Sequence, residues 1–175
     1  MLPAPPASAR NVNAWEPVHV PLTSGTSARS RDLLERVVWQ LDVEANPRYA
    51  ARGGATYCNV FVTDCADALG VRLPHWWLGH ELSANGLLAW IERQGISAFG
   101  WGVVDKVEAR ALALAGRPVV AGWANPRPVG SGHVALVVPS DDDRTRIAQA
   151  GRRCFYGEPV ASGFGALPVT CYAHE

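Results

Sequence analysis

The chain lacks several features that would assign it to common functional classes. It has 16 acidic and 16 basic residues among 175, so its formal net charge is zero. The nearest approach to a basic run is the pair Arg152 and Arg153, which gives no electrostatic support for a nucleic-acid partner. No apolar stretch has the length of a membrane span, so we expect no transmembrane segment. The first residues also lack the apolar core of a secretory signal.

The N-terminal segment differs in composition from the rest of the chain. Residues 1–25 are rich in Pro, Ala and Ser, which predicts a flexible leader. The remaining residues, 26–175, have the length of one ordinary domain, and 48% of the whole chain is apolar, which is enough for a core. Because no secretory signal is evident, we expect the protein to be made in the cytoplasm. Any work in the periplasm or cell wall then needs a non-Sec route, such as a secretion system or phage lysis.

Cysteine and metal-binding motifs are also scarce. The four cysteines are Cys58, Cys65, Cys154 and Cys171, and their spacing does not indicate a dense disulfide framework. Cys154 and Cys171 can pair only if two C-terminal strands bring them together. The sequence has no CxxC or HExxH motif, and His75, His80 and Glu81 are best interpreted as polar loop residues. We therefore expect no metal site and no cofactor.

Helical patterns fill the first two thirds of the chain. From Ser27 to Leu41 and from Cys58 to Leu69, apolar residues recur at helical spacing, and Gly70 is a plausible stop for the second helix. Another helix is predicted from residues 83–85 to Gln94, with Gly95 as its terminator. The last begins at Asp105, where Asp105 and Glu108 form a capping signal, and ends near Gly116.

The pattern then changes to strands, predicted at residues 118–123, 132–138 and 145–150 and in the tail 165–174. Because helices come first and strands second, we expect an α+β fold. In this fold the N-terminal helices pack on a C-terminal antiparallel β-sheet.

Cys58 is the candidate nucleophile because it is expected in the first turn of a helix, with Thr56 as the N-cap. Unpaired N–H groups and the helix dipole favour a thiolate at this position. The same N–H groups can stabilise the oxyanion formed during acyl transfer. Cys65 lies two turns further along the apolar face and is interpreted as core. The alternative for Cys58 is a buried structural cysteine.

His133 is the candidate general base. It follows Gly132 at the start of a predicted strand, where it could face a helix N-terminus that packs on the sheet. If the chain turns near Asp141 and Asp142, His133 lies opposite about Gln149, whose carbonyl oxygen could accept from one ring nitrogen. The alternatives are a surface histidine and an ordinary polar residue of a strand.

The segments that carry these residues resemble a known group. TYCNVFVTD, GHVALVV and IAQAG are similar, in their Cys–His–polar order, to papain-like cell-wall hydrolases of the NlpC and CHAP kind. The segments NPRY, PHWW, ELSANGLLAWI and FYG…GFG are similar to phage-associated and effector-type members, and the resemblance spans roughly residues 40–174. The surroundings of the nucleophile differ, because NlpC-type enzymes usually have D-C-S-G where this chain has Y-C-N-V.

The resemblance implies a papain-like fold and a cysteine peptidase or amidase that cleaves amide bonds in peptidoglycan stem peptides or cross-bridges. Cys58, His133 and Gln149 would be catalytic. Tyr57 and Asn59 would serve the oxyanion or the substrate, and Trp76 and Trp77 would line a substrate groove, although packing in the core or a lid is the alternative for the two tryptophans. An immunity or inhibitor protein that covers the groove is a further candidate partner. Two other functions stay open: a toxin that cleaves or deamidates a host protein, and a non-catalytic module that binds the cell wall.

Overall fold

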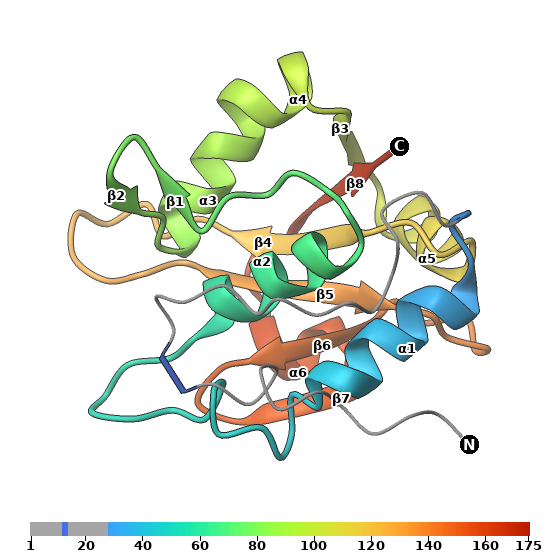
Figure 1. The fold of residues 1–175 in the computed structure, drawn as a ribbon, viewed down its shortest axis with the longest axis horizontal. Coiled ribbons are helices and arrows are strands. Elements are labelled where there is room, and N and C mark those ends of the chain that lie inside the picture. Colours follow the sequence, from blue (N-terminus) through green and yellow to red (C-terminus); the bar gives the residue numbers. More distant parts are fainter. Residues whose placement is uncertain (1–11, 14–27) are drawn as a thin grey trace.

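The computed structural model describes residues 12–13 and 28–175. The predicted leader, residues 1–25, therefore lies outside the described residues apart from Val12 and Asn13. The described chain combines helices with antiparallel β-sheet (Figure 1), which confirms the predicted α+β class. In the described part of the chain, no helix is both long and apolar enough to cross a membrane.

A six-stranded sheet forms the centre of the fold, and every neighbouring pair of its strands is antiparallel. Its strand order is β3-β8-β4-β5-β6-β7. The strands are β3 (Trp101–Val104), β4 (Val119–Trp123), β5 (His133–Val138), β6 (Arg146–Ala150), β7 (Cys154–Pro159) and β8 (Thr170–His174). A small hairpin, β1 (Trp76–Trp77) and β2 (His80–Glu81), stands apart from this sheet.

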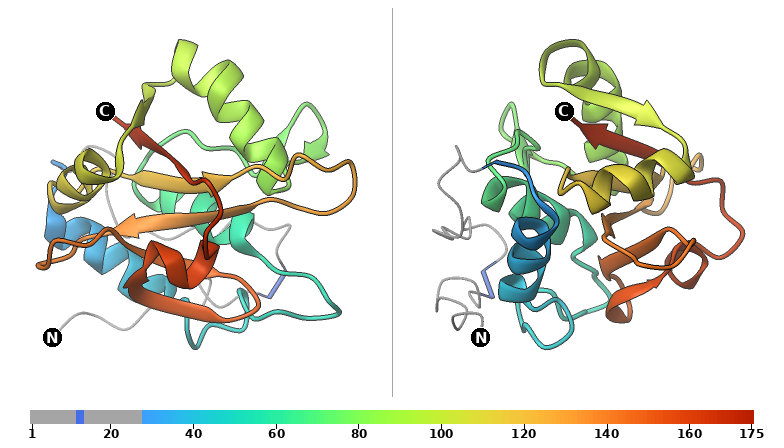
Figure 2. Two further views of the ribbon diagram at one scale, coloured as in Figure 1. Left: turned by 180° about the vertical axis from the view of Figure 1, so that it is seen from behind. Right: turned by 90° about the vertical axis from the view of Figure 1, so that its right-hand side faces the viewer.

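Helices cover both faces of the sheet. The helical elements are α1 (Arg31–Leu41), α2 (Cys58–Ala68), α3 (Ala84–Trp90), η2 (Ile91–Gly95), α4 (Ile96–Ala98), α5 (Lys106–Leu114) and α6 (Val160–Phe164). Viewed from the two sides, α1 and α2 lie in front of β5 and β6, whereas α6 lies behind them (Figures 1 and 2). The central strands are therefore buried on both faces, and every residue of β5 after His133 is buried.

The helix boundaries follow the predicted pattern with local differences. Ser30 caps α1 by accepting from Leu33 N, and Asp105 caps α5 by accepting from Glu108 N at 2.8 Å, as its capping signal predicted. Thr56 is not the cap of α2, because Tyr57 occupies that position without a side-chain bond. Gly95 does not end the third helix. The chain continues through a π-helical turn into α4. A Cβ at Gly95 would lie 3.1 Å from Trp101 Cδ1, so the glycine lets the Trp101 ring pack closely against this turn.

The candidate disulfide between Cys154 and Cys171 is wrong. All four cysteines are free thiols. Cys154 lies on β7 and Cys171 on β8, and the strand order places three strands between them. At a spacing of about 4.8 Å between neighbouring strands, they are roughly 19 Å apart across the sheet, well beyond the reach of a disulfide.

Candidate active site

Cys58 is the first residue of α2 and is 5% exposed. No side chain caps this helix, so the N–H groups of its first turn remain near the sulfur. The thiol lies within hydrogen-bonding reach of the backbone N–H groups of Cys58 itself, Asn59 and Val134. Val134 belongs to β5 and directly follows His133, so the sulfur lies beside the main chain at the start of that strand.

Burial determines the resting charge of this thiol. It raises the pKa of Cys58 above the ordinary cysteine value, and the three backbone N–H groups oppose the rise only in part. The thiolate that the helix N-terminus was expected to favour is therefore not the resting state, because desolvation of the charged form outweighs the N–H groups. A nucleophile of this kind needs a base to remove its proton.

His133 is held by Gln149. The ring Nε2 and Gln149 Oε1 are 2.6 Å apart, and Gln149 Nε2 donates to the carbonyl of Arg153 at 3.0 Å. That second bond fixes the amide orientation, so the oxygen faces the imidazole. An amide oxygen can only accept, which makes Nε2–H of His133 the donor and leaves Nδ1 as the basic nitrogen. The contact expected between His133 and Gln149 is therefore present.

The register behind this contact differs from the expected one. Leu136 pairs with Ala148 and Val137 with Ile147, so Gln149 lies across from Ala135 and meets His133 diagonally. Residues two apart on a strand share a face, which is why the diagonal pair can still join. Gln149 is 5% exposed, so the amide that orients the imidazole is itself almost completely buried.

Helix α6 packs against His133 and Gln149 on the face of the sheet opposite α1 and α2 (Figures 1 and 2). The ring of Phe164 lies 4.8 Å from the ring of His133, centroid to centroid. A Cβ added to Gly163 would lie 2.3 Å from Gln149 Oε1, so α6 approaches the amide as closely as a glycine allows. Burial lowers the pKa of His133, and the bond to Gln149 opposes that change. The imidazole is therefore neutral at pH 7 and available as a base.

The thiol and the imidazole approach β5 from different faces. Gly122 of β4 pairs with Val134, and a Cβ added to Gly122 would lie 2.3 Å from Leu88 Cδ2, so the side chains of Gly122 and Val134 face α3. Side chains alternate along a strand, which turns His133 toward α6. Cys58 therefore lies at the main chain of Val134, whereas the His133 ring packs against Phe164 of α6 and does not line the Cys58 cleft. The expected orientation of His133 toward the start of α2 is thus not the one in this structure.

A cleft of about 430 Å³ opens beside Cys58. Its walls combine the loop before α2, the segment after the β1–β2 hairpin and two residues of the N-terminal segment. The lining residues are Val12, Asn13, Arg52, Ala55, Thr56, Tyr57, Cys58, Asn59, Glu81, Ser83, Ala84 and Ser131. A ligand in this cleft would reach the nucleophile through polar walls that contain both an arginine and a glutamate.

Tyr57 and Asn59 both line the cleft, as expected for residues that flank the nucleophile. The Arg52 guanidinium lies 4.0 Å from the centre of the Tyr57 ring. Asn59 Nδ2 donates to the carbonyl of Leu82 at 3.0 Å, which joins the start of α2 to the segment after the hairpin. Its amide therefore has a structural partner, while its backbone N–H faces the sulfur.

Trp76 and Trp77 are not part of the cleft lining, contrary to the prediction for a groove at the nucleophile. Trp76 lines a separate hollow with residues of α2 and His75. Trp77 packs edge-on against Trp90, with ring centroids 5.7 Å apart. The β1–β2 hairpin turns these rings toward other partners, and Glu81 is its cleft residue instead.

Sequence patterns gave no signal for several residues of the site. Arg52, Glu81 and Phe164 come from a loop, a short hairpin and a short helix, none of which has a recognisable period. The backbone N–H of Val134 has no sequence signature at all. Within the described ranges, 12–13 and 28–175, no three His, Cys, Asp or Glu side chains are grouped so that they could hold a metal ion.

Neither a protein-family model nor a curated protein sequence matches this chain.

Proposed function

We propose that this chain is a papain-like, cysteine-dependent hydrolase that cleaves amide bonds in bacterial peptidoglycan peptides, at a stem peptide or a cross-bridge. One observation supports the proposal most strongly. The Cys58 sulfur, at the start of α2, lies beside the backbone of Val134, and the preceding residue, His133, has one ring nitrogen engaged by Gln149 and the other left basic. Thiol-dependent acyl transfer needs a base within reach of the nucleophile, so the proposal requires the His133 ring to turn toward Cys58 when substrate binds.

The reaction would proceed in two halves. With its ring turned toward the sulfur, His133 Nδ1 takes the thiol proton as the sulfur attacks the carbonyl carbon, and the new C–S bond gives a tetrahedral oxyanion. The backbone N–H groups of Cys58 and Asn59 are suited to stabilise this charge. Collapse breaks the C–N bond, and the amine leaves with the proton from His133. Water then hydrolyses the thioester, which releases the acid and restores the thiol.

A second candidate has a specific observation in its favour. The cleft beside Cys58 is bordered by ordinary peptide main chain, that of Val12 and Asn13, which favours a protease or deamidase acting on a protein. A cell-wall substrate requires the protein to reach the periplasm or wall, and an immunity protein would then protect the producing cell. A protein substrate requires neither of these.

Replacing the nucleophile tests the proposal. We expect Cys58→Ala to lower the release of peptide fragments from purified sacculi by about a thousandfold or more, because the acyl-enzyme cannot form. Cys65→Ala, two turns along the same helix, is the matched control and should keep most activity. Circular dichroism should show that both variants remain folded.

Two results would contradict the proposal. Cleavage of sacculi by Cys58→Ala at the unmodified rate would exclude a cysteine mechanism. Binding of the unmodified protein to sacculi without any cleavage would favour the non-catalytic module. The same preparations should be assayed on unfolded protein, because cleavage of that substrate alone would favour the second candidate.

A further inference from the structure

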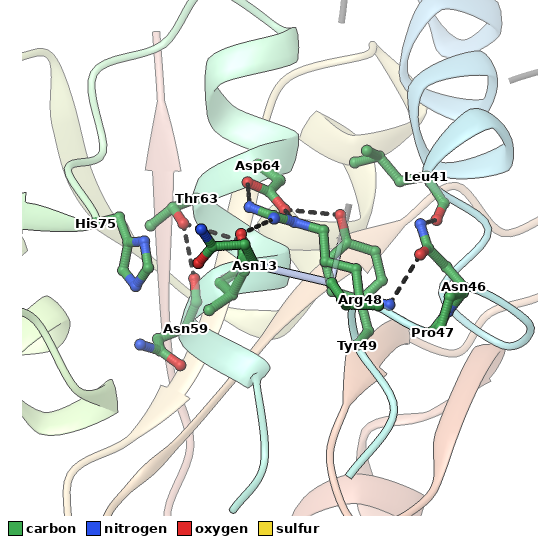
Figure 3. A network of polar contacts seen from close by, with 12 residues as sticks. Asn13, Leu41, Asn46, Pro47, Arg48, Tyr49, Asn59, Thr63, Asp64 and His75 are labelled. Atoms are coloured by element: carbon green, nitrogen blue, oxygen red, sulfur yellow. Dashed lines mark hydrogen bonds and ion pairs between the residues drawn. The ribbon is translucent and has the colours of Figure 1, made fainter. Parts of the chain in front are cut away.

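Two arginines hold the main chain of Val12 and Asn13 at the edge of the Cys58 cleft. Arg48 Nη1 donates to the carbonyl of Asn13 at 2.8 Å, and Arg52 Nη2 donates to the carbonyl of Val12 at 3.1 Å. Both acceptor residues line the cleft. Figure 3 shows Asn13 against α2, between Thr63 and Arg48. Two successive peptide units, from about 35 residues earlier in the chain, are thus held beside the nucleophile.

The first arginine is held by an acidic side chain of α2. The Arg48 side chain is fully buried, and its Nε and Nη2 donate to the two carboxylate oxygens of Asp64 at 2.7 and 3.1 Å. The Tyr49 hydroxyl donates to the same carboxylate at 2.8 Å. A guanidinium held in this way leaves Nη1 pointing to the peptide carbonyl, with no side-chain freedom left to lose on binding.

The second arginine connects this position to the nucleophile. Arg52 Nη1 donates to the carbonyls of Pro47 and Ala50 at 2.7 and 3.2 Å, and its guanidinium lies over the ring of Tyr57. Tyr57 is the N-cap of α2 and directly precedes Cys58. A peptide that bonds to Nη2 of Arg52 is therefore placed next to the residue that carries the thiol.

We propose that Arg48 and Arg52 form a peptide subsite, the arginine clamp, which recognises successive main-chain carbonyls of an extended peptide. In this structure the clamp holds Val12 and Asn13 of the chain itself. The contacts go to backbone oxygens, and Val12 is 55% exposed, so the clamp selects a peptide main chain more than a particular side chain at that position. Val12 and Asn13 thereby lie where an extended peptide ligand would enter the cleft.

The consequence for substrate choice rests on the proposed function. If Cys58 cleaves amides, its substrate is an extended peptide that displaces Val12 and Asn13 from the clamp. A tethered segment has an effective concentration of about millimolar, so it would act as a built-in competitor. Peptide binding by the clamp does not itself depend on catalysis.

The test uses the full chain with a recognition sequence for a site-specific protease inserted after Ser24. After cleavage and removal of the N-terminal fragment, binding of a fluorescein-labelled synthetic peptide of residues 8–17 is followed by fluorescence anisotropy. We expect saturable binding, which Arg52→Gln weakens about tenfold because a charge-assisted hydrogen bond is lost. Arg72→Gln removes an exposed arginine outside the cleft lining and should leave binding unchanged. A peptide with Val12→Ala should bind about as tightly as the original.

Thiol modification gives a second measurement. Removal of the N-terminal fragment should make Cys58 react faster with iodoacetamide. Added peptide should slow this reaction again in the Arg72→Gln protein but not in the Arg52→Gln protein. The fully buried Cys65 reports any unfolding. The absence of peptide binding to the cleaved protein, or equal binding by Arg52→Gln and Arg72→Gln, would overturn the clamp. Loss of hydrolysis with intact peptide binding would contradict the proposed function alone.

Discussion

At the scale of single residues, the site depends on two neutral partners. Burial raises the pKa of the Cys58 thiol and lowers the pKa of the His133 imidazole, so both charged forms are disfavoured at rest. A thiolate–imidazolium pair would need a carboxylate or similar charge nearby. Gln149 supplies only a neutral acceptor. The proposed mechanism therefore relies on proton transfer during attack, with Gln149 fixing which ring nitrogen is basic.

This gives a prediction for the pH dependence. A general base works only when unprotonated, so kcat/KM should rise with pH through the pKa of His133, which lies below the ordinary value of 6.5. Because the bond to Gln149 raises that pKa, Gln149→Ala should move the acid limb to lower pH. It should also reduce kcat about tenfold to a hundredfold, since the ring loses its orientation. Both effects can be measured as fragment release from sacculi between about pH 4 and pH 8, roughly the range in which histidine titrates.

Replacing Gln149 by a carboxylate should shift the acid limb of the pH profile in the opposite direction. Gln149→Glu places a negative charge at the ring, which favours imidazolium, so the acid limb should move to higher pH than in the unmodified protein. If the alanine and glutamate variants shift the limb in the same direction, or neither shifts it, then His133 is not the group that the profile reports.

At the scale of elements, the short helix α6 positions the imidazole. Its Phe164 ring packs on His133, and its Gly163 lies against the Gln149 amide. Gly163 is the second-last residue of α6 before the helix cap at Gly165, so the close approach occurs within the helix and not in the loop after it. Any side chain at this position would push the amide away from the ring.

We therefore expect Gly163→Ala to impair activity more than stability. The added Cβ would lie 2.3 Å from Gln149 Oε1 and 2.9 Å from Ile147 Cδ1, so the amide or the helix must move. The hydrogen bond to His133 should be lost, with a fall in kcat similar to that of Gln149→Ala. Gly102→Ala is the matched control, because a Cβ there meets no atom within 4 Å. Equal activity of the two glycine variants would show that α6 does not hold the amide.

Elements whose apolar residues recur at a regular spacing could be predicted from the sequence, and elements without such a spacing could not. The spacing of apolar residues in α1 and the capping signal of α5 predicted both helices. Strands β3 and β7 gave no such pattern, since β3 has four residues and β7 contains Gly157 and Pro159. Gln149 was found because it follows a strand pattern close to His133. The clamp was missed because Arg48 and Arg52 act through carbonyls distant in the sequence.

At the scale of the whole molecule, one sheet and its two helical layers supply the stability, with no covalent bridge among the described residues. The four thiols are separate, and Cys65 and Cys171 are buried on different elements. Segments that are distant in the sequence are joined by noncovalent contacts instead. The α1 residue Arg31, for example, forms an ion pair with Asp141 in the turn between β5 and β6, at 2.5 Å.

The thermal stability should therefore be independent of reductant. A disulfide between Cys154 and Cys171 would contribute about 3 kcal/mol by the loop-entropy relation, and its reduction would lower Tm by several degrees. Because β7 and β8 are separated by three strands of the sheet, we expect the same Tm with and without dithiothreitol, measured by calorimetry. Cys154→Ser should likewise unfold at one temperature in both buffers. A lower Tm in reductant for the unmodified protein, but not for Cys154→Ser, would mean that the two strands meet and that this strand order is wrong.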